Sequence, residues 1–434
     1  MSAEAKTRAR TSPTLQGPAL VAGRTGAGVA RRYDIDWLRV LAVLLLFPFH
    51  TLRVYNAGEA FYVKGAHPSV AVNAVTEFIS LWHMPLLFLL AGASTYFALG
   101  RRSSRQYLWE RVKRLVVPFV FGVLVLVPPQ TWYGARFNSG SVQSYWDYLT
   151  SGDFLKQNPE GDYWGGWGTG HLWFIQVLFV ISVIVLPLVV WGRTERGGAV
   201  MRSISRRLAH PAWWLLVPWV MAAGLLLPDP PVGHTASYFL PLGHHVAFYL
   251  VFFVLGYLTV SGGEFIKSAV RYRWHALAVG IALALVYLVK ADVADSDTAD
   301  IRELVPVMYA AGLGSWLIIV GLLGCGKRYL DRTSPMLGYL AEASYPVYIL
   351  HQTVIVVAAF YIVGLPAAQP LQWLTLLVVS VACTFALYEV VRRFSISRAL
   401  FGMRPLKKQR GDEAVPAEAG SAARPSVGVA IRAR

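Results

Sequence analysis

Residues 32–53 read RYDIDWLRVLAVLLLFPFHTLR, an apolar run with ionisable side chains at both ends. Arg39 stands at the entrance of the apolar part and His50 stands near its close. A helix turns about 100° and rises about 1.5 Å per residue, so the two side chains would lie within roughly 20° of one face and roughly 16 Å apart along the axis. If this helix crosses a membrane, Arg39 lies near one interface and His50 lies deep in the hydrocarbon zone.

Two interpretations of this pair are open. Ionisable residues deep in a membrane usually face a protein interior or a water-filled path. A histidine there can exchange a proton near neutral pH, and an arginine can hold a phosphate through two hydrogen bonds. Alternatively, Arg39 extends to the interface and His50 only hydrogen-bonds a neighbouring helix.

The composition is that of a membrane protein with several spans. Of the 434 residues, 55% are hydrophobic and only 15% are charged, and the mean hydropathy is +0.47; soluble proteins carry more charge. The net charge of +16 does not indicate a nucleic-acid partner, because the basic residues alternate with apolar runs instead of forming one patch. The two cysteines, Cys325 and Cys383, form no CxxC pair, so a cysteine metal site is not indicated.

The apolar runs predict an all-α integral membrane protein with about ten transmembrane helices. Most of the 40 Lys and Arg residues lie before the first span, after the last span and in alternate loops between them. Because positive residues mark the cytoplasmic side, both termini are predicted to be cytoplasmic. The predicted spans are approximately 36–52, 72–99, 115–130, 171–191, 212–228, 240–260, 274–290, 304–324, 342–363 and 371–391.

Composition also divides the chain into three parts. Residues 1–31 are rich in small and polar residues and lack the apolar core of a signal peptide, which predicts a disordered cytoplasmic tail. Residues 32–393 form the transmembrane domain. Residues 394–434 are predicted to be a basic, largely disordered cytoplasmic tail.

The second span contributes two further candidate residues, Glu77 and His83. They are separated by roughly 120° around one helix, so a direct pair is not expected. Either side chain could approach His50, and a carboxylate there could orient the imidazole as the third member of a catalytic triad does. The alternative is that His83 packs between helices and that Glu77 lies near the outer interface.

A basic stretch precedes the third span and contains Arg111, Lys113 and Arg114. Arg111 and Arg114 are neighbours on one helical face. Two guanidinium groups and an ammonium group at the cytoplasmic interface could hold a pyrophosphate or a 3′-phosphate. They could equally be anchors of the kind that many membrane helices carry.

Further polar residues fall at the starts of later spans. His171 and Trp173 open the fourth span, near the outer face in the predicted topology. Tyr345, Tyr348 and His351 recur every three residues in the ninth span and form a narrow polar stripe. Such a stripe is expected to line a cavity and not to face lipid.

The outer segment 131–170 is rich in aromatic residues that stand beside carboxylates and amides. Aromatic rings can pack against the C–H faces of sugars while polar groups bind the hydroxyls, which suits a carbohydrate. The alternative is an aromatic belt at the membrane interface. The rings are Trp132, Tyr133, Trp146, Tyr148, Tyr163, Trp164 and Trp167.

The sequence contains no phosphate-binding GxxxxGK[ST] loop, no HExxH and no GxSxG. No serine or cysteine stands out as a covalent nucleophile, and no metal site is expected. Direct transfer with a histidine base therefore fits better than a covalent intermediate.

Four motifs, in this order along the chain, resemble those of the membrane acyltransferase-3 family. Arg39 and His50 resemble its R-x10-H signature, and the preceding YDIDWLR is similar to its usual entry to the first span. Ala91 stands where serine is common in the second motif. The resemblance covers roughly residues 32–393, and the other motifs lie at 83–92, 110–118 and 344–351.

The resemblance implies an enzyme of the bacterial cytoplasmic membrane. Family members move acyl groups, often acetyl and sometimes succinyl, from cytoplasmic acyl-CoA to hydroxyls of surface glycans or related glycosylated molecules, macrolides among them. The second span resembles the glucan-succinyltransferase-type branch. Acyl-CoA, the acceptor, membrane lipids and a separate extracytoplasmic protein are the expected partners, with no metal or prosthetic group.

The implied mechanism gives each candidate a role. Arg39, Arg111 and Arg114, with Lys113, would hold the phosphates of acyl-CoA, and His50 would act as general base on the acceptor hydroxyl or as a relay. The remaining candidates would line the cavity: Glu77, His83, His171, Trp173, Tyr345, Tyr348 and His351.

A different class of function is also compatible with these spans. A secondary transporter or flippase for a polar glycan or lipid would carry intramembrane His and Arg too, although such proteins often contain a sequence repeat that is not evident here. A sensor or scaffold without catalysis is a third alternative.

Overall fold

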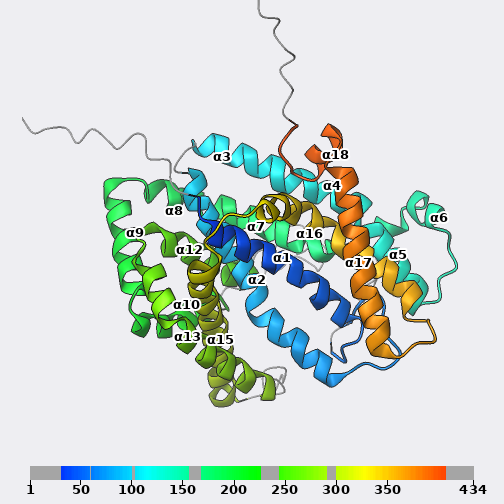
Figure 1. The fold of residues 1–434 in the computed structure, drawn as a ribbon, viewed down its shortest axis with the longest axis horizontal. Helices are drawn as coiled ribbons and strands as arrows, with labels where there is room; N and C mark the ends of the chain where they lie inside the picture. Colours follow the sequence, from blue (N-terminus) through cyan, green and yellow to red (C-terminus); the bar gives the residue numbers. More distant parts are fainter. Residues whose placement is uncertain are drawn as a thin grey trace, which may run out of the picture.

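The described part of the chain consists of α-helices with short π- and 3₁₀-helical turns (Figure 1). A computed structural model describes residues 31–58, 60–99, 103–155, 168–225, 244–290 and 300–406. In chain order the elements are α1 (Tyr33–Arg53), α2 (Val70–Leu99), α3 (Ser104–Arg111), η1 (Val112–Val116), α4 (Val117–Val125), α5 (Val127–Asn138), α6 (Tyr145–Thr150), η2 (Asp153–Leu155), η3 (Gly170–Leu172), α7 (Trp173–Ile184), α8 (Leu186–Trp191), α9 (Glu195–Leu208), η4 (Pro211–Leu216), α10 (Val217–Leu225), α12 (His244–Ser261), α13 (Glu264–Val289), α15 (Ile301–Cys325), η5 (Gly326–Leu330), α16 (Pro335–Ile362), α17 (Gln369–Val391) and α18 (Ser395–Leu400).

The predicted all-helical membrane protein with several spans is confirmed. Among the described residues, seven helical runs are long and apolar enough to cross a membrane, and three shorter apolar helices accompany them. Each of the ten predicted spans overlaps one of these segments, and residues 226–228 and 240–243 of two predicted spans lie outside the described residues. The number of crossings and the side on which the termini lie stay predictions.

The helices of the structure differ from the predicted spans in two respects. The run predicted as 171–191 is interrupted at Val185, because Pro187 at the start of α8 has no N–H for the helical ladder. Helices also occur where loops were expected: α3 lies within the basic stretch before the third span, and α9 is amphipathic. Met201 and Leu208 of α9 are buried, whereas Arg202 is exposed.

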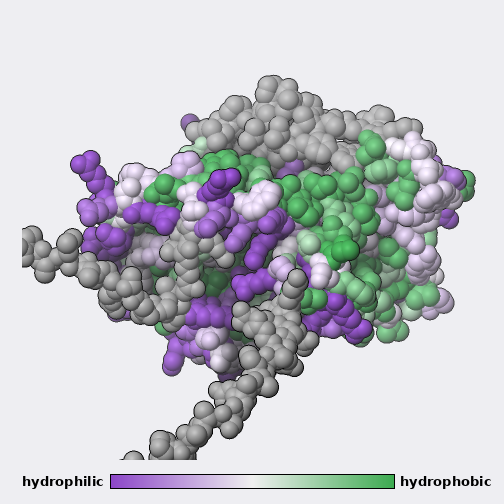
Figure 2. All heavy atoms as spheres, turned by 90° about the horizontal axis from the view of Figure 1, so that it is seen from above, coloured by the Kyte–Doolittle hydropathy of each residue, from purple (hydrophilic) through white to green (hydrophobic). Residues whose placement is uncertain are grey.

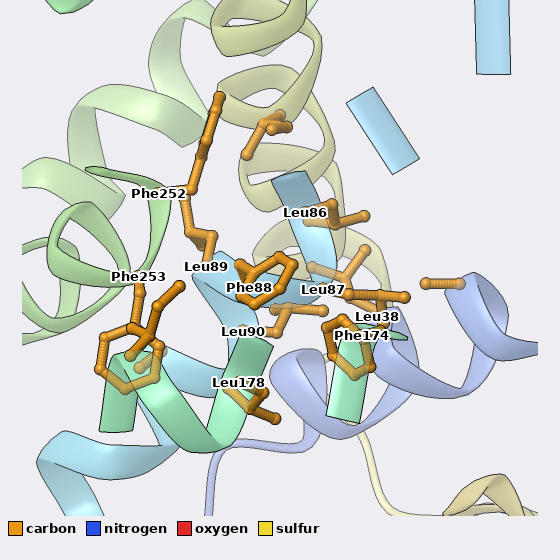
Figure 3. Close-up of a cluster of buried hydrophobic side chains, with 14 of the residues drawn as sticks. Leu38, Leu86, Leu87, Phe88, Leu89, Leu90, Phe174, Leu178, Phe252 and Phe253 are labelled. Carbon is orange, nitrogen blue, oxygen red and sulfur yellow. The ribbon is translucent and has the colours of Figure 1, made fainter. Parts of the chain in front are cut away.

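The core is centred on the Leu86–Leu90 run of α2 (Figure 3). Its side chains pack against α7 and against α12, which approaches α2 very closely. At two places the backbones nearly touch: a Cβ built on Gly92 would lie 1.9 Å from the carbonyl oxygen of Phe253, and one built on Gly256 would lie 1.9 Å from that of Leu89. Small residues permit this approach in membrane bundles, where apolar side chains gain little from leaving lipid.

The surface matches a lipid environment. Large apolar side chains are exposed on several helices, for example Val120 and Leu124 of α4, Leu285 of α13 and Val378 of α17. Figure 2 views the molecule from above Figure 1, and in it hydrophilic residues gather over the left and the middle while a broad hydrophobic area lies to the right. Exposed apolar surface on this scale is expected of a protein whose sides face acyl chains.

Several basic residues lie at one end of the bundle, which we call the basic end: the end where α1 begins and where η1, η5 and α18 lie. Trp37 Nε1 donates to the carbonyl oxygen of Arg332 at 3.1 Å, which places η5 beside the start of α1. The hydroxyl of Tyr345 donates to the carbonyl oxygen of Arg114 at 2.6 Å, which places η1 beside α16. The opposite end, which contains the close of α1 and the loop after it, we call the aromatic end.

Part of the predicted C-terminal tail packs against the basic end. Arg398 of α18 is buried; its Nη2 lies 2.8 Å from Glu342 Oε1 and its Nε donates to the carbonyl oxygen of Arg404 at 2.7 Å. Gly402 lies against the ring of Tyr345. The tail is thus helical over Ser395–Leu400, while the predicted disorder of residues 1–30 and 407–434 lies outside the described residues.

Candidate active site

Three histidines from distant parts of the chain meet in the interior between α1, η3 and α16. The ring centroids of His50 and His351 are 5.0 Å apart, and those of His171 and His351 are 5.2 Å apart. All three rings are buried. We call His50, His171 and His351 the histidine cluster.

Backbone carbonyls determine the orientation of two of these rings. His351 Nδ1 lies 2.6 Å from the carbonyl oxygen of Tyr348, and His171 Nε2 lies 2.9 Å from that of Ile349. A carbonyl only accepts, so each of these nitrogens carries the proton. In the neutral rings His351 Nε2 and His171 Nδ1 are therefore acceptors. Both atoms are buried without a hydrogen-bond partner in the described part of the chain, as is His50 Nδ1.

The local sequence of α1 ties the helix to α17 beside His50. Pro48 stands two residues before it and contributes no N–H to the helical ladder. The hydroxyl of Thr51 donates to the carbonyl oxygen of Phe47 at 2.8 Å, and Trp373 Nε1 of α17 donates to the Thr51 hydroxyl at 3.1 Å. The backbone that carries His50 is thereby held from two sides.

His83 of α2 is buried against α1 but contacts it differently. Its Nε2 donates to the carbonyl oxygen of Ala42 at 2.7 Å, because a carbonyl can only accept. Its ring lies 6.2 Å from that of Phe49. His83 therefore joins α2 to α1, which agrees with the packing interpretation of this residue.

The remaining candidates on α2 and α7 lie away from the cluster. Glu77 accepts a hydrogen bond from Asn73 Nδ2 at 2.6 Å, near the start of α2. No hydrogen bond or ion pair in the described residues joins it to His50, so the carboxylate-oriented imidazole considered from the sequence is not formed. Trp173 is half-buried against the rings of Phe88 and Tyr249.

Arg39 lies half-exposed at the basic end. It forms an ion pair with Asp36 on the preceding turn of α1, and its side chain remains 36% exposed. An exposed guanidinium with one carboxylate partner can exchange that partner for another anion. The position is compatible both with anchoring and with phosphate binding.

The basic stretch before α4 contains a π-helical turn, η1. Arg111 is half-buried, with its Nη2 donating to Thr95 Oγ1 at 2.8 Å and its guanidinium 4.9 Å from the ring centroid of Tyr107. Lys113 and Arg114 are exposed. π-Turns within helices are frequent at functional sites. A π-helical turn contains more residues than an α-helical turn. The angles between Arg111, Lys113 and Arg114 around the helix axis therefore differ from those that α-helical spacing predicts.

The stripe on α16 connects the basic end to the histidine cluster. The rings of Tyr345 and Tyr348 are stacked 6.5 Å apart, and the ring of Tyr348 lies 5.8 Å from both His171 and His351. Tyr345 donates to the carbonyl of Arg114 and Tyr348 donates to that of His171. Both hydroxyls thus fasten α16 to its neighbours, and the stripe faces protein and not lipid.

Sequence analysis missed several polar and aromatic residues around the cluster. Phe61, in the loop after α1, stacks on His50 with the centroids 6.2 Å apart. Gln352 Nε2 donates to Gln130 Oε1 at 3.1 Å, and Gln130 Nε2 donates to Thr353 Oγ1 at 2.8 Å. Buried amides in apolar spans were the available signal for the glutamines; nothing in the sequence placed Phe61 over His50.

The aromatic end contains part of the predicted aromatic segment. Trp132, Tyr133 and Tyr148 are partly or fully packed, with Trp132 Nε1 bonded to the carbonyl of Gln143 at 3.0 Å. Trp146 of α6 is 72% exposed. The predicted rings at 163, 164 and 167 lie outside the described residues.

This arrangement can perform acid–base chemistry inside a membrane. A buried imidazole with an unpaired nitrogen can take a proton from a hydroxyl, provided that the hydroxyl comes within hydrogen-bond distance. In the described residues, no group of three or more His, Cys, Asp or Glu side chains is arranged to hold a metal ion. The chemistry that the cluster itself offers is that of its imidazoles.

Comparisons with known proteins identify the family of this chain. Three proteins of Escherichia coli named glucans biosynthesis protein C, from strains SMS-3-5, O157:H7 EC4115 and O6:K15:H31 536, are each 26% identical to this chain over 395 residues. The alignment covers 88% of this chain and 97% of each relative. The sequence model of the acyltransferase-3 family, described as an acyltransferase domain, matches residues 32–389, which is nearly the whole transmembrane part. The chain thus belongs to the acyltransferase-3 family and is a membrane acyltransferase.

Proposed function

We propose that this protein transfers an acyl group, acetyl or succinyl, from acyl-CoA to a hydroxyl of a glycan. The observation that carries the proposal is the line of contacts from Arg114 through Tyr345 and Tyr348 to His171 and His351, and then to His50. A donor that binds at one end of this line and an acceptor that enters from the other would meet at a buried base.

The basic end suits the donor. Acyl-CoA carries several phosphates, and guanidinium groups bind phosphate through two parallel hydrogen bonds. Arg39, Lys113 and Arg114 are accessible at this end, and Arg111 is half-buried on the same stretch as Arg114. The pantetheine arm with its acyl group would extend along α16 toward the cluster.

The aromatic end suits a carbohydrate acceptor. Trp146 and Tyr361 expose their rings there, and Tyr361 shares a hydrogen bond of 3.0 Å with Tyr133. Gln143 and Asp153 add an amide and a carboxylate joined at 2.7 Å. The similar Escherichia coli proteins are named for glucan biosynthesis, which favours a glucan or related surface glycan over a macrolide.

The proposed setting is the bacterial cytoplasmic membrane, with the basic end and both termini in the cytoplasm. The excess of Lys and Arg in alternate loops supports this orientation. The acceptor would then lie outside the cytoplasm, where a separate protein delivers or holds it.

We predict that the arginines of the basic end govern donor affinity. In detergent-purified protein, Arg39→Ala, Arg111→Ala and Arg114→Ala should each weaken binding of acetyl-CoA and succinyl-CoA about tenfold, because a hydrogen bond to a charged group contributes about 1.5–3 kcal/mol. Added salt should weaken binding by the wild type more than by the variants. Calorimetric titration measures both effects.

Arg202→Ala is the matched control, because it removes an equal charge from an exposed position on α9. It should bind the donors as the wild type does. Equal affinity in the three other variants would remove these arginines from the donor site. Absence of binding by folded wild-type protein would contradict the acyl-CoA donor altogether.

A further inference from the structure

The histidine cluster has hydrogen-bonding capacity that a single base does not use. His50 Nδ1, His171 Nδ1 and His351 Nε2 are all buried without a partner in the part of the chain that the structure describes. Buried polar atoms are nearly always paired in folded proteins, so three unpaired ring nitrogens in one cluster call for an explanation. Two of them, on His171 and His351, are acceptors because the opposite nitrogens donate to carbonyls.

A histidine that acts as a base usually needs a second group. That group accepts a hydrogen bond from the N–H of the far nitrogen, orients the ring and stabilises the imidazolium. In the described residues no hydrogen bond or ion pair joins His50 to a carboxylate, and Glu77 is bonded to Asn73. The nearest ring with a free acceptor is His351, at 5.0 Å between centroids.

We propose that His351 is the positioning residue of His50: its Nε2 accepts the N–H of His50, so that the other nitrogen of His50 is held as the base. This inference rests on the proposed function. The contact is open in the resting protein, as catalytic hydrogen bonds often are before substrate binds. His171, whose Nδ1 is the second acceptor, lies beside His351 on the side of α7.

The step balances without any further reagent. His50 removes the proton from the acceptor hydroxyl as the oxygen attacks the thioester carbonyl. The new C–O bond forms, the C–S bond breaks, and His50 returns the proton to the departing sulfur of CoA. During the step the positive charge is shared between His50 and His351.

An imidazole suits this place better than a carboxylate. A permanently charged carboxylate in the membrane interior carries a large desolvation cost, whereas a neutral imidazole accepts the same hydrogen bond without adding charge at rest. The bonds from His351 Nδ1 to the carbonyl of Tyr348 and from His171 Nε2 to the carbonyl of Ile349 hold the two rings in fixed tautomers. The hydroxyl of Tyr348 also donates to the backbone carbonyl of His171.

Two variants of His351 separate positioning from packing. His351→Phe keeps an aromatic ring against Phe47, whose centroid lies 6.0 Å from that of His351, but has no acceptor. His351→Gln keeps an acceptor oxygen. We expect His351→Phe to lower kcat about 10²-fold, the scale of acid–base assistance, and His351→Gln to retain part of the activity. The dissociation constant for acetyl-CoA should change less than twofold in both.

The assay follows release of the CoA thiol from acetyl-CoA or succinyl-CoA, with a soluble glucan oligosaccharide as acceptor probe and the full-length protein in nanodiscs. His83→Phe replaces another buried imidazole that donates to a backbone carbonyl, so it measures the structural cost of losing such a ring and its bond. That cost should stay below tenfold in kcat. A His351→Phe variant with the kcat of the wild type would overturn the proposal.

Failure of the proposed function would look different. In that case the wild type releases no thiol with any donor, or His50→Ala stays active, whatever His351 does. If His351→Phe does not fold, ¹⁵N NMR of histidine-labelled wild type decides. A proton on His351 Nδ1 and none on Nε2 in the resting protein supports the proposal, and a proton on Nε2 overturns it.

Discussion

His50→Ala is expected to abolish acyl transfer while the protein remains folded. The ring is buried between α1 and α16 and lies 5.0 Å from that of His351, which the stripe on α16 links by side-chain contacts to the basic end. Loss of a positioned acid–base group typically costs about 10²–10⁴ in rate. The measurement is thiol release from acetyl-CoA by purified protein.

Binding data distinguish lost chemistry from lost structure. His50→Ala should bind acetyl-CoA with the affinity of the wild type, since the arginines of the basic end are untouched. His275→Ala is the control, because it removes an exposed histidine of α13. Near-wild-type transfer by folded His50→Ala would show that His50 is not the base.

The helical framework could be predicted from sequence because lipid leaves a spanning segment few alternatives. Backbone groups in hydrocarbon must bond within their own helix, so each apolar run of sufficient length becomes one. Arg39 and His50 were placed on α1 by the same reasoning. Breaks such as that at Val185 depend on a single proline and on the packing around it, which shifts boundaries by several residues.

The assembly of the site could be predicted only in part. The polar stripe on α16 is a local pattern, and the spacing of Tyr345, Tyr348 and His351 determines which face they share. The packing of α1, η3 and α16 determines which histidine lies next to His50. The spacing of residues along the sequence carries no information on how these helices pack. From the sequence, Glu77 was considered as the group that orients the His50 ring, because a carboxylate is the commoner partner of a catalytic histidine. The geometry instead offers this role to His351.

Replacing the glycines between α2 and α12 is expected to lower the stability of the protein strongly. Gly92→Ala and Gly256→Ala should each destabilise the protein by about 1–3 kcal/mol, the usual cost of forcing extra atoms into a packed interface. The added Cβ would lie 1.9 Å from a backbone carbonyl oxygen of the other helix. The two helices would have to move apart, and that movement would disturb the Leu86–Leu90 core. Thermal unfolding in detergent measures the loss.

Gly338→Ala makes the same chemical change on α16, at a position where the added Cβ meets nothing within 4 Å. Alanine is favoured over glycine within a helix by about 1 kcal/mol, so this variant should be slightly more stable than the wild type. The two kinds of substitution therefore shift the unfolding temperature in opposite directions. An unchanged or raised unfolding temperature in Gly256→Ala would mean that α2 and α12 are not in backbone contact, and the packing that positions His83 against α1 would then need another support.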